Sequence, residues 1–239
     1  PGRCCGCDSL GYAVMKTHRT KAIVLRRTNY GEADRILQLL TPENGIQSVI
    51  ARGVRREKSK LAGGIELFAR CDVNVGTGKG ELGILTSARL EQFYSHIMTD
   101  YERLQFGYDA IKQVTKAAST IDEPAFFDLL DQTFISLDAP DIDVRLTKAW
   151  FWLQLAIVLG VGMNLETDTN GMKLVEDATY NFSEQEHAFV FHEGGTYTAD
   201  HIKLLRLLSA QAPKVAAHVK NVDELINDVL WIAERAVAH

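Results

Sequence analysis

Cysteine is scarce in this 239-residue chain, which has four cysteines and none beyond position 71. Three of them, Cys4, Cys5 and Cys7, crowd the first seven residues, and Cys71 stands alone in a strand-like run. A disulfide framework spread through the fold is therefore excluded, which favours a reducing, cytoplasmic setting. Because the first three cysteines have no second group of metal ligands near them, we expect residues 1–14 to be an added leader or a misassigned start ahead of Met15.

Long apolar runs and catalytic motifs are absent as well. The longest apolar run, 149–163, is too short to span a bilayer, and no secretory signal follows Met15. The sequence has neither the G-x-S-x-G nor the H-E-x-x-H pattern of hydrolases. The glycine-rich stretch GTGKG at 76–80 lacks the spacing of a phosphate-binding loop and falls between two strand-like runs. These absences favour a binding protein over an enzyme or a membrane protein.

Charge is divided unevenly along the chain. The formal net charge is -5, but residues 16–95 carry a net +6 and residues 96–239 a net -11. A basic first part joined to an acidic second part is typical of a localised footprint for a polyanion. The whole-chain average hides this division.

Apolar residues alternate in strand fashion five times between positions 18 and 93. Turn residues separate these runs, and Pro42-Glu43-Asn44-Gly45 is the strongest turn signal. Five short strands at this spacing are typical of a small closed or partly closed barrel, although an SH3-like barrel or a split sandwich has the same spacing. The expected strands are 18–27, 35–41, 46–52, 67–75 and 82–93.

After Tyr94 the apolar period changes to that of helices. The segment 163–199 interrupts the helical pattern, because it is rich in Asn, Asp, Thr and Gly, and it contains one possible hairpin at 188–198. Asp200 is expected to cap the helix that follows it. The expected helices are 100–119, 124–137, 141–159, 200–210 and a last one from Asn221 or Asp223 to about Ala238.

An ordered set of short matches runs through the first module and resembles the RecO family of bacterial recombination mediators. The matching pieces are AIVL at 22–25, YGEADRIL at 30–37, LT at 40–41, Gly45, ARGVR at 51–55, SKL at 59–61 and LT at 85–86. Two later stretches, 151–165 and 198–208, resemble the helical part of the family more weakly. The resemblance implies an α+β fold, with a five-stranded barrel of the oligonucleotide-binding (OB) type at 15–95. An all-helical partner-binding domain at 96–239 follows, with a cysteine-free irregular insert at about 163–199.

The resemblance also implies a function and a set of partners. It implies binding of single- and double-stranded DNA and annealing of complementary strands. It further implies work with RecR and with single-stranded DNA-binding protein, so that RecA is loaded on DNA. The action would be non-covalent and cytoplasmic, without catalytic residues or a membrane.

The insert departs from the family in its metal ligands. Many members carry four zinc-binding cysteines there, whereas this chain has Thr167 and Asn170 about where the first pair would stand. The histidines at 187, 192 and 201 have no thiolate companions, so we interpret them as solvated side chains and not as zinc ligands. We expect no metal and no cofactor.

Binding of single-stranded nucleic acid needs cations that follow the backbone and flat groups that stack on bases. The connection after the third expected strand is dense in cations, neighbouring strands add more, and Tyr30 beside Gly31 is a possible stacking group. Phe68 is interpreted as a core residue, and Glu32 and Asp34 could instead pair with the arginine that follows them. The residues expected to contact DNA are Arg26, Arg27, Tyr30, Arg35, Arg52, Arg55, Arg56, Lys58 and Lys60.

The resemblance implies that the helical domain receives the acidic, apolar C-terminal tail of single-stranded DNA-binding protein. Such a site needs an apolar pocket with cations at its rim. Arg145, Lys148 and Trp152 lie along one expected helix and are the residues proposed for it, while at least one of Trp150 and Trp152 is expected in the core. Two other readings stay open: a metal-dependent nuclease that uses Glu32 and Asp34, and an adaptor that contacts proteins but never DNA.

Overall fold

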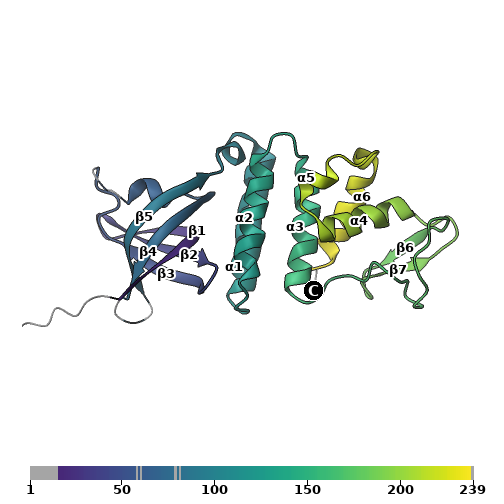
Figure 1. Ribbon diagram of the computed structural model, residues 1–239, viewed down its shortest axis with the longest axis horizontal. Coiled ribbons are helices and arrows are strands. Elements are labelled where there is room, and N and C mark those ends of the chain that lie inside the picture. Colours follow the sequence, from purple (N-terminus) through teal and green to yellow (C-terminus); the bar gives the residue numbers. More distant parts are fainter. Residues whose placement is uncertain (1–15, 58, 60, 78–79, 81, 238–239) are drawn as a thin grey trace, which may run out of the picture.

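The computed structural model describes residues 16–237 except 58, 60, 78–79 and 81. Five strands form a closed barrel in the order β1-β2-β3-β5-β4, at one end of an elongated molecule (Figure 1). The expected five-stranded N-terminal sheet is thereby confirmed, although its first strand runs further than its pattern indicated. The strands are β1 (Thr17–Tyr30), β2 (Asp34–Thr41), β3 (Gly45–Ala51), β4 (Ala69–Gly76) and β5 (Gly83–Phe93).

Alternation along each strand gives the barrel an inner and an outer side. The inner core contains Val24, Leu37, Leu39, Val49 and Ala51, all at most 1 % exposed. Successive side chains of a strand point to opposite faces, so the residues between these positions point outward. The outward side of the barrel therefore decides what a ligand can reach.

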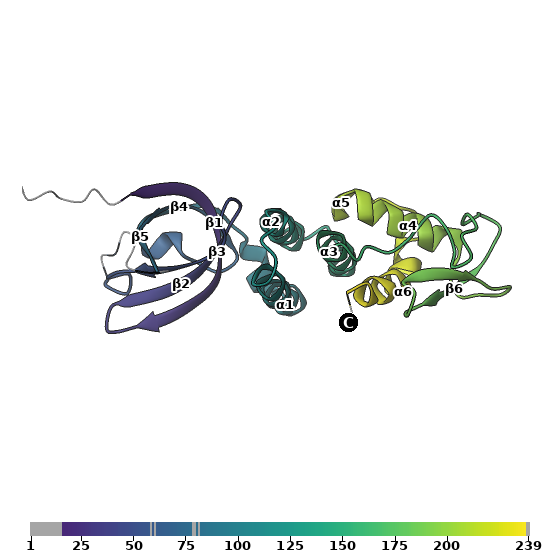
Figure 2. The same cartoon turned by 90° about the horizontal axis from the view of Figure 1, so that it is seen from below.

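Helices and a short hairpin follow the barrel, and α1 and α2 stand between the barrel and the remaining helices (Figures 1 and 2). Asp100 and Asp143 cap α1 and α3, because their carboxylates accept the amides of Arg103 at 2.9 Å and Arg145 at 2.7 Å. Two short 3-10 turns lie at Ala62–Gly64 and Ser95–Thr99. The longer elements are α1 (Tyr101–Ala118), α2 (Ala125–Asp138), α3 (Val144–Val158), β6 (Tyr180–Ser183), β7 (Ala188–Phe191), α4 (Ala199–Ala210), α5 (Pro213–Ala216) and α6 (Val222–Arg235).

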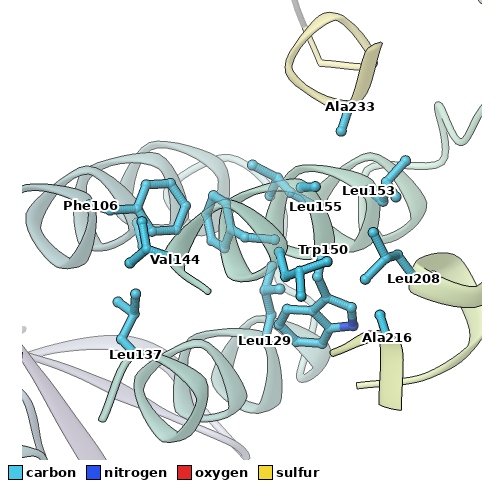
Figure 3. Packing of buried hydrophobic residues seen from close by; sticks show 14 of the residues in the cluster. Phe106, Leu129, Leu137, Val144, Trp150, Leu153, Leu155, Leu208, Ala216 and Ala233 are labelled. Atoms are coloured by element: carbon cyan, nitrogen blue, oxygen red, sulfur yellow. The ribbon is translucent and has the colours of Figure 1, made fainter. Parts of the chain in front are cut away.

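The helices share one apolar core with the outer side of the barrel. Trp150 is 7 % exposed and packs among Leu129, Leu208 and Ala216, which confirms that at least one of Trp150 and Trp152 lies in the core (Figure 3). Phe68, 1 % exposed, joins this core from the barrel and meets Phe134 of α2 edge-on. The barrel is therefore packed against the helices and not merely tethered to them.

Three local expectations were wrong. The hairpin pairs Tyr180 with Phe191, so its first strand lies eight residues before the expected start at Ala188. The cap of α4 is Thr198, in a capping box with His201, while Asp200 lies within the first turn. His201 is 7 % exposed and its Nε2 lies 3.4 Å from Asp228, so it is a buried structural residue and not a solvated one.

The insert between α3 and α4 is organised by side chains that accept backbone amides. Asp168, 7 % exposed, accepts the amides of Asn170 and Met172 at 2.9 Å each. Thr179 accepts those of Gly194 and Gly195 at 3.1 Å each. The described residues contain no group of three or more His, Cys, Asp or Glu that could hold a metal ion. The side chains of this insert therefore do not fit a zinc site.

We expect the insert to fold without metal and to depend on Asp168. Asp168→Ala should lower the free energy of unfolding by about 2 kcal/mol, because two backbone amides lose their acceptor. A chelator should leave the melting temperature of the unmutated protein unchanged. Thermal unfolding with and without chelator measures both effects. Asp177→Ala, at an exposed acid of the same insert, is the control, and a melting temperature lowered by chelator alone contradicts the prediction.

In the part of the chain that the structure describes, every helix is too short or too polar to cross a membrane.

Candidate nucleic-acid interface

A bulge in β1 brings Arg26 to the outer side of the barrel. The pairing of β1 with β2 shifts by one residue between Val24 and Arg26, and Arg26 then lies opposite Gln38. Gln38 stands between the inward residues Leu37 and Leu39, so both it and Arg26 point outward. Without the extra residue, Leu25 would take the place of Arg26.

The same register places an aromatic side chain near the end of this surface. Tyr30 is four residues beyond Arg26 on β1, on the same side of the strand, and is 55 % exposed. Arg52 follows the inward residue Ala51 at the end of β3 and is exposed. A cation from β1, a cation beyond β3 and an exposed ring thus share the outer side of the β1-β2-β3 sheet.

The loop after β3 is fastened to the turn between β1 and β2. Asp34 accepts the amide of Gly53 at 2.7 Å, and the amide of Arg55 donates to the carbonyl oxygen of Ala33 at 2.9 Å. Gly53 has φ of +64°, a conformation that glycine adopts without strain. The loop therefore lies beside Tyr30 and presents Arg55 and Arg56, both exposed.

We call Arg26, Tyr30, Arg52, Arg55 and Arg56 the basic face. Among the residues that the structure describes, none of its four arginines forms a salt bridge with an acid. Their charge is therefore available to a polyanion.

The other expected DNA contacts lie elsewhere. Arg27 points to the opposite side of β1 and pairs with Glu66 at 2.7 Å. Arg35 lies opposite Ala51 on the inner side of the sheet and donates to the side chain of Asn29 at 3.2 Å. The structure thus separates Arg27 and Arg35 from the basic face, while Lys58 and Lys60 lie outside the described residues.

Arg35 does not pair with Glu32 or Asp34, which was the alternative to DNA contact. The carboxylate of Asp34 accepts the amide of Gly53, and the guanidinium of Arg35 donates to the side-chain amide oxygen of Asn29. Asp34 therefore holds the loop that carries Arg55 and Arg56, a role that sequence reasoning missed. The nearest sequence signal was Gly53, which is 19 residues after Asp34 and says nothing about pairing.

The surface around β4 and β5 also carries cations, and several of them pair with acids. Arg19 pairs with Asp72 and holds the pKa of that carboxyl below its ordinary value. Arg70 donates to Glu91 at 3.2 Å and to Asp131 at 2.6 Å. Arg89 of β5 is exposed and forms no salt bridge among the described residues, so the basic face holds most but not all of the unmatched positive charge of the module.

The residues expected to hold a partner's tail do not share one site. Arg145 pairs with Asp143 at 2.6 Å and Asp223 at 3.3 Å, and Lys148 pairs with Glu102 at 2.6 Å. Trp152, in contrast, lines a groove of about 430 Å³ between α1, α3 and α6. The residues lining this groove are Gln113, Lys116, Ala117, Thr120, Trp152, Leu155, Leu159, Glu234 and Val237, so its cation is Lys116.

Comparison with known proteins finds similarity over the barrel and over most of the chain. Residues 15–94 match the family model described as "Recombination protein O N terminal". DNA repair protein RecO of Dehalococcoides mccartyi is 29% identical over 226 residues, which cover 91% of this chain and 88% of that protein.

Two further relatives match over shorter stretches. DNA repair protein RecO of a Roseiflexus species is 33% identical over 169 residues, or 70% of this chain, and that of Thermobifida fusca is 34% identical over 155 residues, or 64% of this chain. The matches span 59% and 63% of those two proteins. The chain is thus similar to DNA repair proteins named RecO over most of its length, and residues 15–94 match the recombination protein O N-terminal model.

Proposed function

We propose that this protein binds single- and double-stranded DNA in repair and recombination, and that the basic face of an OB-type barrel holds the DNA. It anneals complementary strands and helps to load RecA on DNA coated with single-stranded DNA-binding protein. RecR and the C-terminal tail of that coating protein are its proposed partners, in the cytoplasm. The names of its relatives support the repair role, and the barrel supports the mode of binding.

The proposal rests on one observation. Four arginines that form no salt bridge among the described residues lie with an exposed aromatic ring on one side of the barrel. Arginine can hold a phosphate through two hydrogen bonds, and an aromatic ring stacks on any base. The strand order, in which β3 pairs with β5 in parallel, suits the five-stranded barrels that bind oligonucleotides on the face of their second and third strands. Each feature matches one need of a single-stranded polyanion.

Annealing follows from charge alone. Two complementary strands repel each other through their phosphates, and cations that neutralise one strand lower this repulsion. No covalent step is needed, so we assign no catalytic residue.

The groove at Trp152 is the proposed place for the partner's tail. Its apolar wall can take apolar side chains, and Lys116 can meet a carboxylate. Arg145 and Lys148 keep their acidic partners in this arrangement and take no direct part in it.

A nuclease is disfavoured by the position of its two proposed acids. Asp34 accepts a backbone amide, which commits one of its oxygens to the loop. Glu32 lies exposed in the turn, and the described residues offer no cluster of three metal-binding side chains around the pair.

Salt dependence tests the proposal directly. With the four arginines of the basic face each neutralising one phosphate, log K for single-stranded DNA should fall with log salt at a slope of about -3, or about -4 if Lys58 and Lys60 take part. Fluorescence anisotropy of a labelled oligothymidine across salt concentrations measures the slope. An affinity independent of salt, or no binding at low salt, would leave the DNA-independent adaptor as the better reading.

A further inference from the structure

Helix α1 carries an exposed stripe that the proposed barrel site does not use. Tyr101, Gln105, Tyr108 and Lys112 follow one another at intervals of four, three and four residues, so they lie on one face of the helix. Tyr101 is 77 % exposed and Tyr108 is 48 % exposed. Gln105 donates to the hydroxyl of Tyr101 at 3.2 Å. We call these four residues the α1 stripe.

One edge of the α1 stripe borders the barrel. Tyr108 meets Phe68 edge-on, with ring centroids 5.1 Å apart, and a side chain at Gly107 would collide with the same ring. The opposite flank of α1 faces α3, because Glu102 on that flank pairs with Lys148. The two acids nearest the stripe, Glu102 and Asp109, are seven residues apart and share this far flank.

The outer side of β1, β2 and β3 leads from the basic face to the foot of α1. Beyond Arg26 and Gln38, the next outward residues on these two strands are Leu25 and Leu40, which are buried in the core shared with the helices. On β3, Ile46 packs against the same core, and α1 contacts both β1 and β3. A chain that lies on the basic face and continues along the strands therefore arrives at α1.

The chemistry of the α1 stripe is that of the basic face. It offers two exposed phenol rings, an amide and one ammonium group, and Lys112 forms no salt bridge among the described residues. Rings that stack on bases together with cations that meet phosphates are what single-stranded nucleic acid requires.

We propose that the α1 stripe is a second contact site for single-stranded nucleic acid, reached only by strands long enough to extend beyond the basic face. Tyr101 and Tyr108 stack on bases, and Lys112 neutralises a phosphate. This proposal rests on the function proposed for the barrel. It predicts that DNA contacts α1 only when the strand is long, because a short oligonucleotide binds the barrel alone.

Anisotropy with two labelled oligothymidines, of about 6 and about 20 nucleotides, tests the proposal in the full chain. Tyr101→Ala combined with Tyr108→Ala should lower the affinity for the long strand about tenfold and leave that for the short strand unchanged. Lys112→Gln should make the salt slope for the long strand shallower by about 0.7 and leave the short-strand slope as it is. Tyr101→Ala alone should show part of the effect, and at 77 % exposure it does not endanger the fold.

Matched changes far from the α1 stripe serve as controls. Phe191→Ala removes a ring that is 52 % exposed on β7, and Lys214→Gln removes an exposed cation of α5; neither should change binding of either strand. An unchanged long-strand affinity in the tyrosine variants overturns the proposal, and so does an equal loss for both strands. Arg55→Glu tests the barrel site independently of the α1 stripe. It should weaken the binding of both strands, because the long and the short strand both contact the basic face. If the unmutated protein binds neither strand, the function proposed for the barrel fails as well.

Discussion

Reversing the charge of Arg55 and Arg56 together should lower the affinity for single-stranded DNA by on the order of 10- to 100-fold at 0.1 M salt. Both side chains are exposed on the loop after β3, and no acid neutralises them among the described residues. Losing two phosphate contacts removes the release of their counterions, and the new carboxylates repel the backbone. The salt slope should become shallower by about 1.4. Anisotropy titrations at several salt concentrations give both quantities.

Two controls separate a local effect from a change in overall charge. Lys214→Glu with Lys220→Glu changes the net charge equally, on the helical part, and should leave affinity within about twofold because α5 and the segment after it lie beyond α1 and α2 from the barrel (Figure 1), and salt screens distant charges. Arg27→Gln removes a cation of the same strand that already faces Glu66, and it should also have little effect on binding. Equal losses in the two double variants, with a smaller loss in Arg27→Gln, would mean that binding follows total charge and that the basic face is not a site.

The strands could be predicted from the sequence because alternation is a local property. Their register is not local, and it decides which arginines reach DNA. The adjacent residues Arg26 and Arg27 look equivalent in the sequence, yet the bulge after Val24 turns Arg26 outward, opposite Gln38, and leaves Arg27 to pair with Glu66. Charge density therefore identified the module but not the individual contacts.

The same limit applies to the helical part. Arg145, Lys148 and Trp152 follow one face of α3, which their spacing indicated correctly. The spacing could not show that Glu102 of α1 would neutralise Lys148, or that Asp223 would join the neighbouring Asp143 in pairing with Arg145, while Trp152 lies beside a groove. Acids distant in sequence thus make part of this cationic helix face a contact of α3 with α1 and α6.

The link between barrel and helices also depends on contacts distant in sequence. Asp131 of α2 is 6 % exposed and accepts the hydroxyl of Tyr94 at 2.6 Å and the guanidinium of Arg70, from β4, at 2.6 Å. Burial raises the pKa of the Tyr94 phenol, so it remains a donor across the physiological range. One buried carboxylate thus joins a barrel strand, the segment after β5 and a helix.

Asp131→Ala is expected to cost about 3 kcal/mol of unfolding free energy, because the buried Tyr94 hydroxyl loses its acceptor and the Arg70 guanidinium keeps only Glu91. For a protein of this size, that loss corresponds to a fall in melting temperature of roughly 6–12 °C. Tyr94→Phe removes only the hydroxyl and should cost about 1 kcal/mol. Denaturant unfolding of the two variants and of the double variant gives the coupling between the residues.

The comparison with Asp128→Ala makes the test specific, since that acid is exposed on the same helix and should change stability by less than about 0.5 kcal/mol. A cost below about 1 kcal/mol for Asp131→Ala would mean that the apolar contacts around Phe68 and Phe134 hold the barrel to the helices by themselves. A large cost has a further consequence for DNA. The position of the α1 stripe relative to the basic face is set at this joint, so a variant that remains folded but loosened should lose long-strand affinity before it loses short-strand affinity.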